Sequence, residues 1–550
     1  MAILGKPLFK LGSMAIYRPW SLLPWMVDFS NAYPAAFQIQ MLPCFVGIFF
    51  GTTLAILVSI HLGKANKAGL TTHGSARWAL GKEIEQSGLL SCSGVLLGLT
   101  LDENHYLRHD GPEHICVFAP TRSGKGVGLV IPTLLSWTGS VVCFDPKGEN
   151  WKLTSGFRNQ FGRCIYFDPT SAQSARFNPM SEIRKGICEV KDAQNIADML
   201  VDPDGSKQNQ SHWERTAHSL LVGAILHVIY VEQDKTLSGL AMFLSHPERT
   251  FQDTLSAMLN TRHLGDRVHP VVASSARELF NKAPEELSGV LSTAISFLSL
   301  YRDPVVACAT SHSDFRITDL MSDEHPVSLY LVVPPSDITR TKALIRLILN
   351  QIGRVLTESL EPRKHRLLWL LDEFPALGRL DFFESALAYM AGYGMKSFLV
   401  TQSLNQIDGI YGASNAILDN CHIRIAFASN DERTAKRISE LLGQKTELKE
   451  QKSFSGKRVS FFMDNQSVSF HEFSRPLLMP SEITQLSPKD QIVFVAGFPP
   501  ILAKKLRYYE DPQLAKRVLA LAPLPEIEEV VTTQNDSTRI EKLNLKGIAL

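Results

Sequence analysis

Two features that would assign this chain to a class are missing from its composition: an excess of one charge and closely paired cysteines. Its 56 lysines and arginines balance 55 aspartates and glutamates, which leaves a formal net charge of +1. A chain this close to neutrality has no overall attraction for nucleic acid, so any contact with DNA must come from local basic clusters. The eight cysteines include no C-x-x-C pair, which argues against a zinc site or a disulfide framework and favours reduced thiols.

Long uncharged apolar runs are also nearly absent, and the exception lies at residues 41–62. This stretch, MLPCFVGIFFGTTLAILVSIHL, contains no Asp, Glu, Lys or Arg. A helix of about 20 apolar residues crosses the ~30 Å hydrocarbon core of a bilayer, so we predict a transmembrane helix over residues 37–63. Residues 1–36 would then form a periplasmic or interfacial segment, and the number of helices before residue 37 stays open. A buried helix of a soluble domain is the alternative.

A phosphate-binding loop is predicted at residues 119–126, APTRSGKG. It follows a strand-like apolar run, HICVF, and opens a helix with apolar periodicity, which is the context that a P-loop requires. Backbone N–H groups of such a loop cradle phosphates, and Lys125 would reach the terminal ones. Ala119 and Gly126 depart from the general G-x-x-x-x-G-K-[ST] pattern, so the residue that supplies the hydroxyl beside magnesium stays open. The nucleotide-binding residues predicted from this motif are Pro120, Thr121, Arg122, Ser123, Gly124, Lys125, Gly126 and Val127.

Two later strands end in polar side chains that complete this chemistry. Residues 366–373, RLLWLLDE, form an apolar strand that ends in two carboxylates, a Walker B pattern. Asp372 would hold the magnesium ion, and Glu373 would polarise the attacking water as general base. Gln402 ends another buried strand and would sense the terminal phosphate, because ligands sit beyond the carboxyl ends of parallel strands. A solvent-facing glutamine at a strand end is the alternative for Gln402.

Seven stretches of the chain carry a resemblance to a known family: HGSARWA (73–79), APTRSGKGVGLVIPTLL (119–135), FDPKGE (144–149), LLDEFPALG (370–378), AGYGMKSFLVTQSLNQI (391–407), SRPLLMP (474–480) and VFVAGFPPILAKKLRYYED (493–511). Together they resemble the type IV secretion coupling proteins of the TraG/VirD type. The resemblance implies an ATP-hydrolysing motor, with ATP and Mg²⁺ as cofactors, that recruits relaxase–DNA complexes, effector proteins or both. It further implies delivery to the subunits of a type IV secretion channel, DNA contacts without sequence specificity, and a homo-hexamer. The expected location is the bacterial inner (plasma) membrane, with the catalytic domain in the cytoplasm.

The order of strand and helix patterns predicts an α/β fold: a RecA-like P-loop ATPase domain with an inserted all-α domain. Residues 64–179 and 302–520 alternate strands with helices, which assigns both segments to the nucleotide-binding domain. Between residues 180 and 301 helical periodicity takes over, so the all-α insertion is placed there. Residues 521–550 have mixed polarity and a weak pattern, and we expect a loosely ordered tail.

The arginine candidates rest on less specific signals. Ring-shaped motors usually complete their site with an arginine from the neighbouring subunit, which stabilises charge on the transferring phosphoryl group. Arg424 is the first candidate and Arg433 the second, and an ordinary structural role is the alternative for each. Basic clusters at 363–366 and 504–507 could contact DNA phosphates around a pore, or could be solvated faces.

Two other functions use some of the same motifs. An FtsK-like double-stranded DNA pump shares the RecA-like motor, but the large helical insertion ahead of the Walker B strand argues against it. A receptor for effector proteins with a structural nucleotide site is the second alternative. The intact Asp372–Glu373 pair argues against that reading, because a structural pocket needs no carboxylate that activates water. The sequence does not separate DNA cargo from protein cargo.

Overall fold

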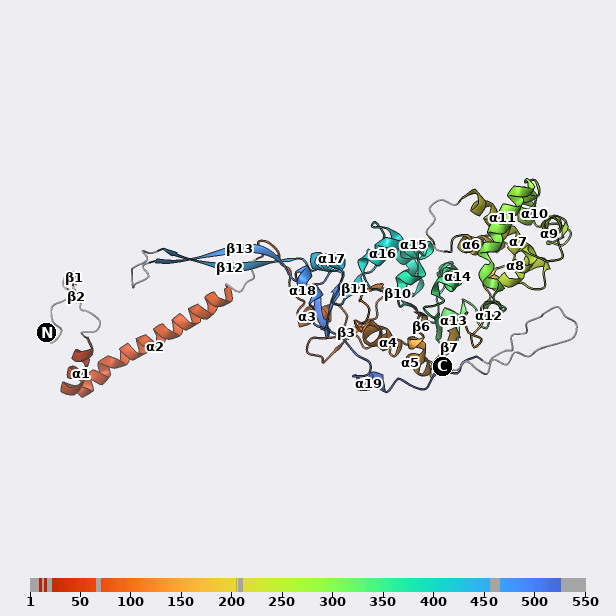
Figure 1. Cartoon of the computed structure of the whole chain (residues 1–550). Helices are drawn as coiled ribbons and strands as arrows, with labels where there is room; N and C mark the ends of the chain where they lie inside the picture. Colours follow the sequence, from red (N-terminus) through yellow and green to blue (C-terminus); the bar gives the residue numbers. More distant parts are fainter. Residues whose placement is uncertain are drawn as a thin grey trace. The chain divides into compact units, whose positions relative to one another are not determined.

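The computed structural model describes residues 9–11, 14–16, 22–65, 71–203, 205, 211–455 and 465–525 (Figure 1). It divides into two compact units. The first comprises Met1–Ser75 with Gln444–Arg475, and the second comprises Ala76–Gly443 with Pro476–Leu550. Residues 444–475, which the sequence assigns to the nucleotide-binding domain, therefore group with the N-terminal segment. Most of the predicted tail, from residue 526 onward, lies outside the described residues.

In its described residues, the first unit consists of two helices and two two-stranded sheets. Its elements are β1 (Phe9–Leu11), β2 (Met14–Ile16), α1 (Leu22–Ala32), α2 (Pro34–Ala65), β12 (Gln444–Ser455) and β13 (Asn465–Pro476). The transmembrane helix predicted at residues 37–63 falls within α2. No helix in the described part of the chain is both long enough and apolar enough to cross a membrane, so the structure does not show that span. Within the uncharged run, the side chains of residues 41–45 and 60–62 lie outside the described part.

The second unit is organised around an 11-stranded sheet of order β4-β3-β15-β14-β11-β5-β10-β9-β6-β8-β7. The strands from β11 to β7 in this order are parallel, and β14, β15 and β3 add antiparallel pairs at one side. The bounds are β3 (Val95–Leu99), β4 (Tyr106–His109), β5 (Ile115–Phe118), β6 (Ser140–Asp145), β7 (Arg163–Phe167), β8 (Val327–Val332), β9 (Leu367–Leu371), β10 (Met395–Thr401), β11 (Ile423–Ala426), β14 (Asp490–Val495) and β15 (Ile501–Lys504). This mixed sheet with a large parallel part is the α/β architecture that the strand pattern predicts.

The central strands are apolar throughout because both faces of the sheet are covered. Strands β6, β8, β9 and β10 are buried along their whole length, as is typical of parallel strands between two helical layers. On one face, Trp369 packs in a core with residues of α14 (Ile338–Leu356) and α15 (Asp381–Met390). On the other face, Leu368 and Leu370 pack with Leu129 and Leu134 from the helical segment after the P-loop. Alternate side chains of β9 thus pack into two hydrophobic cores, one on each face of the sheet.

The stretch predicted to be all-α, residues 180–301, contains helices and no strand of the sheet among its described residues. Figure 1 shows these helices gathered together at one end of the second unit. They are α6 (Glu189–Val201), α7 (His212–Val231), α8 (Leu237–Leu244), α9 (Phe251–Asn260), α10 (Pro270–Phe280) and α11 (Pro284–Phe297). The remaining helical segments of the second unit are α3 (Gly81–Gln86), η2 (Gly126–Val130), α4 (Ile131–Leu134), α5 (Glu149–Arg158), η3 (Pro179–Glu182), η4 (Ser299–Arg302), α12 (Pro304–Ala309), α13 (Asp319–Ser322), η5 (Phe374–Leu377), η6 (Ala391–Tyr393), α16 (Leu404–Tyr411), α17 (Glu432–Leu442), α18 (Pro480–Thr484) and α19 (Pro512–Ala515).

A buried histidine pair lies inside this helical region. His227 Nδ1 and His263 Nε2 are 2.9 Å apart and share one hydrogen bond, and the His227 ring stacks on Phe243. His227 is 1% exposed, and burial, with His263 beside it, lowers the pKa of His227 to about 4. The hydrogen bond needs one ring nitrogen as donor and the other as acceptor, so both rings fit best when neutral.

We predict that low pH decreases the free energy of unfolding through protonation of His227. The pKa of His227 lies below its unfolded value near 6.5, so the unfolded chain binds the proton first and stability falls as pH drops from 6.5 towards 4. The loss at pH 5 should be about 2 kcal/mol. Urea unfolding at pH 7 and pH 5 measures it, with His227→Gln expected to reduce the pH difference by about that amount and exposed His105→Gln to leave it unchanged. An equal pH dependence in wild type and His227→Gln would show that His227 is not the cause.

Candidate nucleotide-binding site

The loop after β5 has a backbone shaped for binding phosphate. Arg122 and Gly124 have φ values of +60° and +88°, so two left-handed residues flank Ser123. Successive backbone N–H groups in such turns form a concave nest that attracts anions. Glycine adopts this conformation freely, whereas at Arg122 it is strained by roughly 1–2 kcal/mol. Strain of this kind is typical of functional loops.

The helical segment after the loop packs very closely against the backbone at Leu506. A Cβ atom on Gly128 would lie 2.8 Å from the carbonyl oxygen of Leu506, so no larger residue fits there without backbone movement. Gly126 differs, because nothing lies within 4 Å of where its Cβ would be. Sterics therefore do not explain why Gly126 replaces the usual hydroxyl residue of a P-loop.

Beside this loop, the predicted site residues come together in one hydrogen-bonded cluster. Lys125 Nζ lies 2.6 Å from Glu373 Oε2 and 3.1 Å from Asp372 Oδ1. Gln402 Nε2 donates to Glu373 Oε1 at 2.6 Å. Thr121 Oγ1 donates to Gln402 Oε1 at 3.0 Å and links the cluster back to the P-loop. Gln402 therefore does not face solvent, which was the alternative left open by its sequence position.

The sheet order explains why these residues meet. Strand β10 lies between β5 and β9, and all three run parallel. Their carboxyl ends carry the P-loop, Gln402 and the Asp372–Glu373 pair, so the three groups lie side by side at one edge. Glu373 follows β9 with a φ of +66°, a left-handed turn that ends the strand before η5 begins.

The charges of the cluster favour a bound cation. Burial opposes ionisation of Lys125, but Asp372 and Glu373 outweigh it and raise the pKa of Lys125 above its usual value. Burial raises the pKa of Asp372, and Lys125 offsets that effect only in part. Two carboxylates against one ammonium leave net negative charge in a half-buried site. Oxygen ligands of this kind are what Mg²⁺ prefers.

The side chain of Ser123 also fits a nucleotide site. Its Oγ atom is buried and makes no hydrogen bond within the described part of the chain. A buried hydroxyl without a partner is costly unless another group satisfies it. Lying in the nest between Arg122 and Gly124, it is placed to donate to a phosphate oxygen. The loop, the ammonium and the carboxylates together therefore fit Mg²⁺ with a nucleoside triphosphate.

Asp145 is a residue of this site that the sequence reasoning missed. It ends β6, whose register places it next to Asp372 because Phe144 pairs with Leu371. Its Oδ2 accepts a hydrogen bond from Trp151 N at 2.9 Å, at the start of α5. Burial raises the pKa of Asp145 to about 6, and Asp372 adds to that rise. The FDPKGE motif contained the signal, but only the strand register shows that two carboxyl groups are neighbours.

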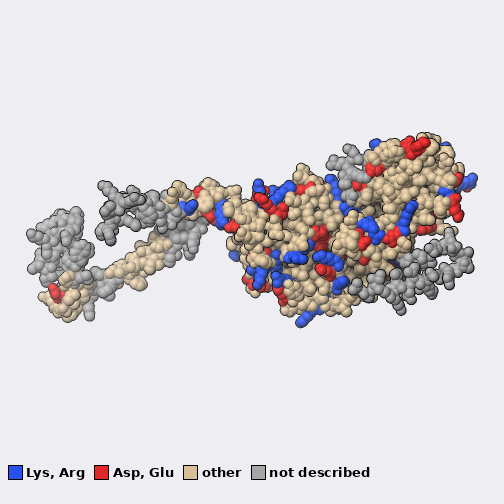
Figure 2. Space-filling model, viewed as in Figure 1, with Lys and Arg blue, Asp and Glu red and all other residues tan. Residues whose placement is uncertain are grey.

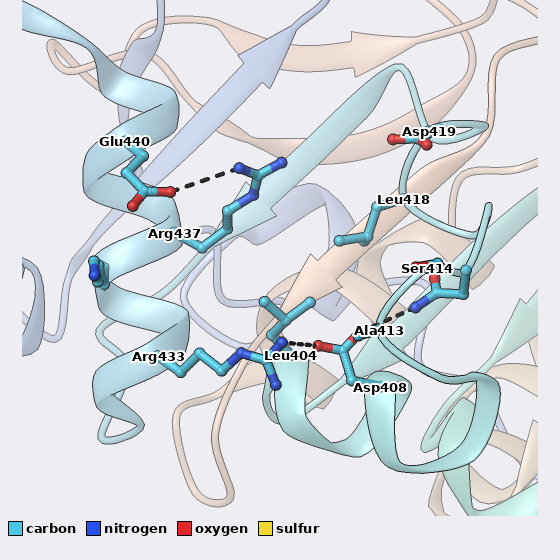
Figure 3. A pocket seen from close by; sticks show the side chains of 11 residues that line it. Leu404, Asp408, Ala413, Ser414, Leu418, Asp419, Arg433, Arg437 and Glu440 are labelled. Carbon is cyan, nitrogen blue, oxygen red and sulfur yellow. Dashed lines mark hydrogen bonds and ion pairs between the residues drawn. The ribbon is translucent and has the colours of Figure 1, made fainter.

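Neither candidate arginine joins this cluster. Arg424 in β11 pairs with Cys116 near the amino end of β5, and its guanidinium donates to the carbonyl oxygens of Leu418 and Cys421 at 2.8 and 3.2 Å. Arg433 lies in α17 and forms an ion pair of 2.6 Å with Asp408 (Figure 3). The cavity shown there, of about 620 Å³, lies between α16 and α17. Within one chain, both arginines are thus engaged outside the P-loop cluster.

Half of the lysines and arginines in the basic clusters proposed for DNA form ion pairs with acidic residues. Arg366 forms an ion pair with Asp110, Lys504 with Asp490 at 2.6 Å, and Arg507 with Glu510 at 2.8 Å. Figure 2 shows Lys and Arg interspersed with Asp and Glu over the visible face of the second unit. This face therefore carries no extended patch of one charge, in agreement with the near-zero net charge of the sequence.

Comparison with known proteins agrees with the site and the fold. The family model described as "Type IV secretory system Conjugative DNA transfer" matches residues 77–534. The chain is 42% identical to the conjugal transfer protein TraG of Escherichia coli, over 94% of this chain and 88% of that protein. It is 30% identical to the protein VirD4 of Rhizobium rhizogenes, over 90% and 74% respectively.

Solved structures show the same fold at lower identity. The bacterial conjugative coupling protein TrwBdeltaN70 aligns with a TM-score of 0.59 at 19% identity, covering 81% of this chain and 98% of that one. TrwB in complex with ADP and Mg²⁺ aligns with a TM-score of 0.58 at 18% identity, covering 80% and 96%. The family match and the TraG identity extend over most of the chain, and the residues that meet at the P-loop lie within the matched range. The chain therefore belongs to the type IV secretory system conjugative DNA transfer family, and it is a coupling protein of conjugative DNA transfer.

Proposed function

We propose that this coupling protein is a motor that hydrolyses ATP to drive substrate transfer. The observation that carries the proposal is the contact of Lys125 with Asp372 and Glu373 at the carboxyl ends of adjacent parallel strands. A relative's complex with ADP and Mg²⁺ supports the same ligands here. Asp372 would hold Mg²⁺, which when bound neutralises charge on the phosphates. ATP is the expected nucleotide.

Each residue of the cluster has a distinct proposed role. Lys125 binds the terminal phosphates, and the nest around Ser123 binds phosphate oxygens through its backbone. Glu373 accepts the proton of the attacking water. Its carboxylate would be free to do so once the Lys125 ammonium pairs with the phosphates instead of with Glu373. Gln402 donates to Glu373 and accepts from Thr121, so it holds the base in position and connects it to the P-loop.

We also propose the partners and the assembly of the motor. The cargo would be a relaxase–DNA complex, effector proteins or both, delivered to the subunits of a type IV secretion channel. DNA would be contacted without sequence specificity, through the phosphates. A homo-hexamer would allow Arg424 of one subunit to stabilise charge at the site of the next, since Arg424 lies at the opposite sheet edge from its own P-loop.

Turnover measured on purified full-length protein tests the proposed motor. ATP hydrolysis is followed with and without single-stranded and duplex DNA. We expect magnesium-dependent hydrolysis that DNA stimulates, because the family acts in conjugative DNA transfer. Absence of hydrolysis under all of these conditions would contradict the proposal, whereas binding without hydrolysis would favour a receptor with a structural nucleotide site.

We further propose that the chain is anchored in the bacterial inner membrane, with the catalytic domain in the cytoplasm. The support is the uncharged run at residues 41–62, together with apolar side chains exposed along α2, such as Phe49 at 69% and Leu54 at 63%. Removal of residues 1–64 should move the protein from the membrane fraction to the supernatant on sedimentation. A truncated protein that still sediments with membranes would show that this segment is not the anchor.

A further inference from the structure

A second cavity, of about 440 Å³, lies directly against the P-loop. The backbone and side chains of residues 120–124 form one wall of it, and Val127 continues that wall. Lys125 is not among its lining residues, because its ammonium contacts Asp372 and Glu373. The carboxylate cluster therefore lies on one side of the loop, and this cavity lies on another.

The far wall of the cavity comes from strands that are distant in the sequence. Strand β11 is parallel to β5, β14 is antiparallel to β11, and β15 is antiparallel to β14. The carboxyl ends of β5, β11 and β15 and the amino end of β14 therefore reach the same sheet edge. The residues that line the cavity from these ends include Asn430 after β11, Leu486 and Pro488 before β14, and Lys505 and Tyr509 after β15.

Lys505 connects this wall to the P-loop. Its Nζ donates to the carbonyl oxygen of Ser123 at 3.2 Å and lies 3.7 Å from the centre of the Phe427 ring. Burial, with Arg507 nearby, lowers the pKa of Lys505 to about 8. The contact joins the P-loop to the segment that carries Tyr509.

The remaining lining groups have the chemistry of a nucleoside site. Tyr509 is 53% exposed, so part of its ring is free to stack on a planar base. The side chain of Asn430 makes no hydrogen bond within the described residues, and it offers both a donor and an acceptor. Leu486 and Pro488 supply apolar surface for a ring. Arg122 and Arg507 also line the cavity, so its walls combine apolar surface with polar and charged groups. Apolar surface with a small number of placed polar groups is usual for sites that hold small organic ligands.

We propose that this cavity binds the base and ribose of the nucleotide, with Tyr509 stacking on the base and Asn430 hydrogen-bonding to it. The proposal rests on the proposed function, since it presumes that the P-loop holds the phosphates. A nucleotide with its terminal phosphates beside Lys125 would extend along the loop, and its nucleoside would reach the cavity on the other side. The carboxyl-terminal YYED segment would then contribute to nucleotide affinity, although it lies more than 380 residues after Lys125 in sequence.

The test compares binding of ATP and of inorganic tripolyphosphate, with Mg²⁺, to full-length wild type, Tyr509→Ala, Tyr509→Phe and Asn430→Ala. Loss of one base-stacking partner should weaken ATP binding by about tenfold in Tyr509→Ala. Binding of tripolyphosphate should be unchanged, because it has no base. Tyr509→Phe keeps the ring and should bind ATP like wild type. Tyr389→Ala, a change of another exposed tyrosine before the amino end of β10, is the control and should change neither.

The outcomes separate this proposal from the proposed function. If wild type binds ATP and Tyr509→Ala and Asn430→Ala bind it equally well, the nucleoside lies elsewhere and the proposal is overturned. Equal weakening of ATP and tripolyphosphate by Tyr509→Ala would also overturn it, since the change would act on the phosphate site. If wild type binds neither ligand while Lys125→Ala behaves identically, the proposed function itself fails and this inference fails with it.

Discussion

Lys125→Ala should lower ATP turnover by at least about 100-fold, to the limit of detection in a steady-state assay. The Lys125 ammonium is the group that faces the carboxylate cluster where the terminal phosphates are expected. Without it, developing charge on the transferring group loses a charge-assisted partner in a half-buried site. The change also leaves Asp372 and Glu373 next to each other with no cation, so phosphate binding should weaken as well.

The control for this change is Lys82→Ala, which removes an exposed lysine of the same size. Lys82 lies in α3, outside the carboxylate cluster and the basic clusters, and its loss should leave turnover within about twofold of wild type, as is usual for surface changes. Both proteins should accumulate to the same level as wild type. Turnover of Lys125→Ala near the wild-type rate would rule out the P-loop as the catalytic site.

Glu373→Gln should separate nucleotide binding from hydrolysis. The glutamine side chain keeps the size of Glu373 and can still accept the hydrogen bond from Gln402, but it cannot take a proton from water. Loss of a positioned general base lowers rates by about 10²–10⁴-fold. Asp372 and the P-loop remain, so ATP affinity should stay close to wild type. Equilibrium binding and steady-state turnover measured on the same preparation check both halves of this expectation.

Glu285→Gln is the matched control, because Glu285 is exposed in the first turn of α11 and lies outside the P-loop cluster. It should bind and hydrolyse ATP like wild type. If Glu373→Gln hydrolyses ATP at the wild-type rate, Glu373 is not the base, and Asp145 or a water relay must be considered. If it loses binding instead, its ion pair with Lys125 has a structural role that the proposed mechanism does not include.

The parts of the site that could be predicted from sequence are those in which local pattern and function coincide. Strands such as β9 are buried on both faces and so read as unbroken apolar runs, and the polar residue that ends such a run marks the ligand edge. Asp372, Glu373 and Gln402 follow from this rule alone. The contacts of Asp372 and Glu373 with Lys125, and of Gln402 with Glu373, also depend on the position of β10 between β5 and β9, which the sequence order of the strands does not state.

The parts that could not be predicted depend on register and on distant segments. Asp145 becomes a neighbour of Asp372 only through the pairing of β6 with β9. The cavity beside the P-loop needs the reversal of chain direction at β14 and β15, which periodicity does not reveal. A role for Arg424 in a neighbouring subunit's site likewise depends on the assembly; within one chain its guanidinium donates to the carbonyl oxygens of Leu418 and Cys421.

Conjugative transfer by donor cells tests most directly whether hydrolysis at this site drives DNA transfer. Donors that produce wild type, Glu373→Gln or Glu285→Gln in place of the chromosomal or plasmid copy are mated, and transconjugants are counted at equal protein level. We predict that Glu373→Gln reduces transfer to the level of donors without the protein, while Glu285→Gln transfers like wild type. Transfer at the wild-type frequency by Glu373→Gln, with its ATP turnover shown to be lost, would contradict the proposal that ATP hydrolysis at this site drives DNA transfer.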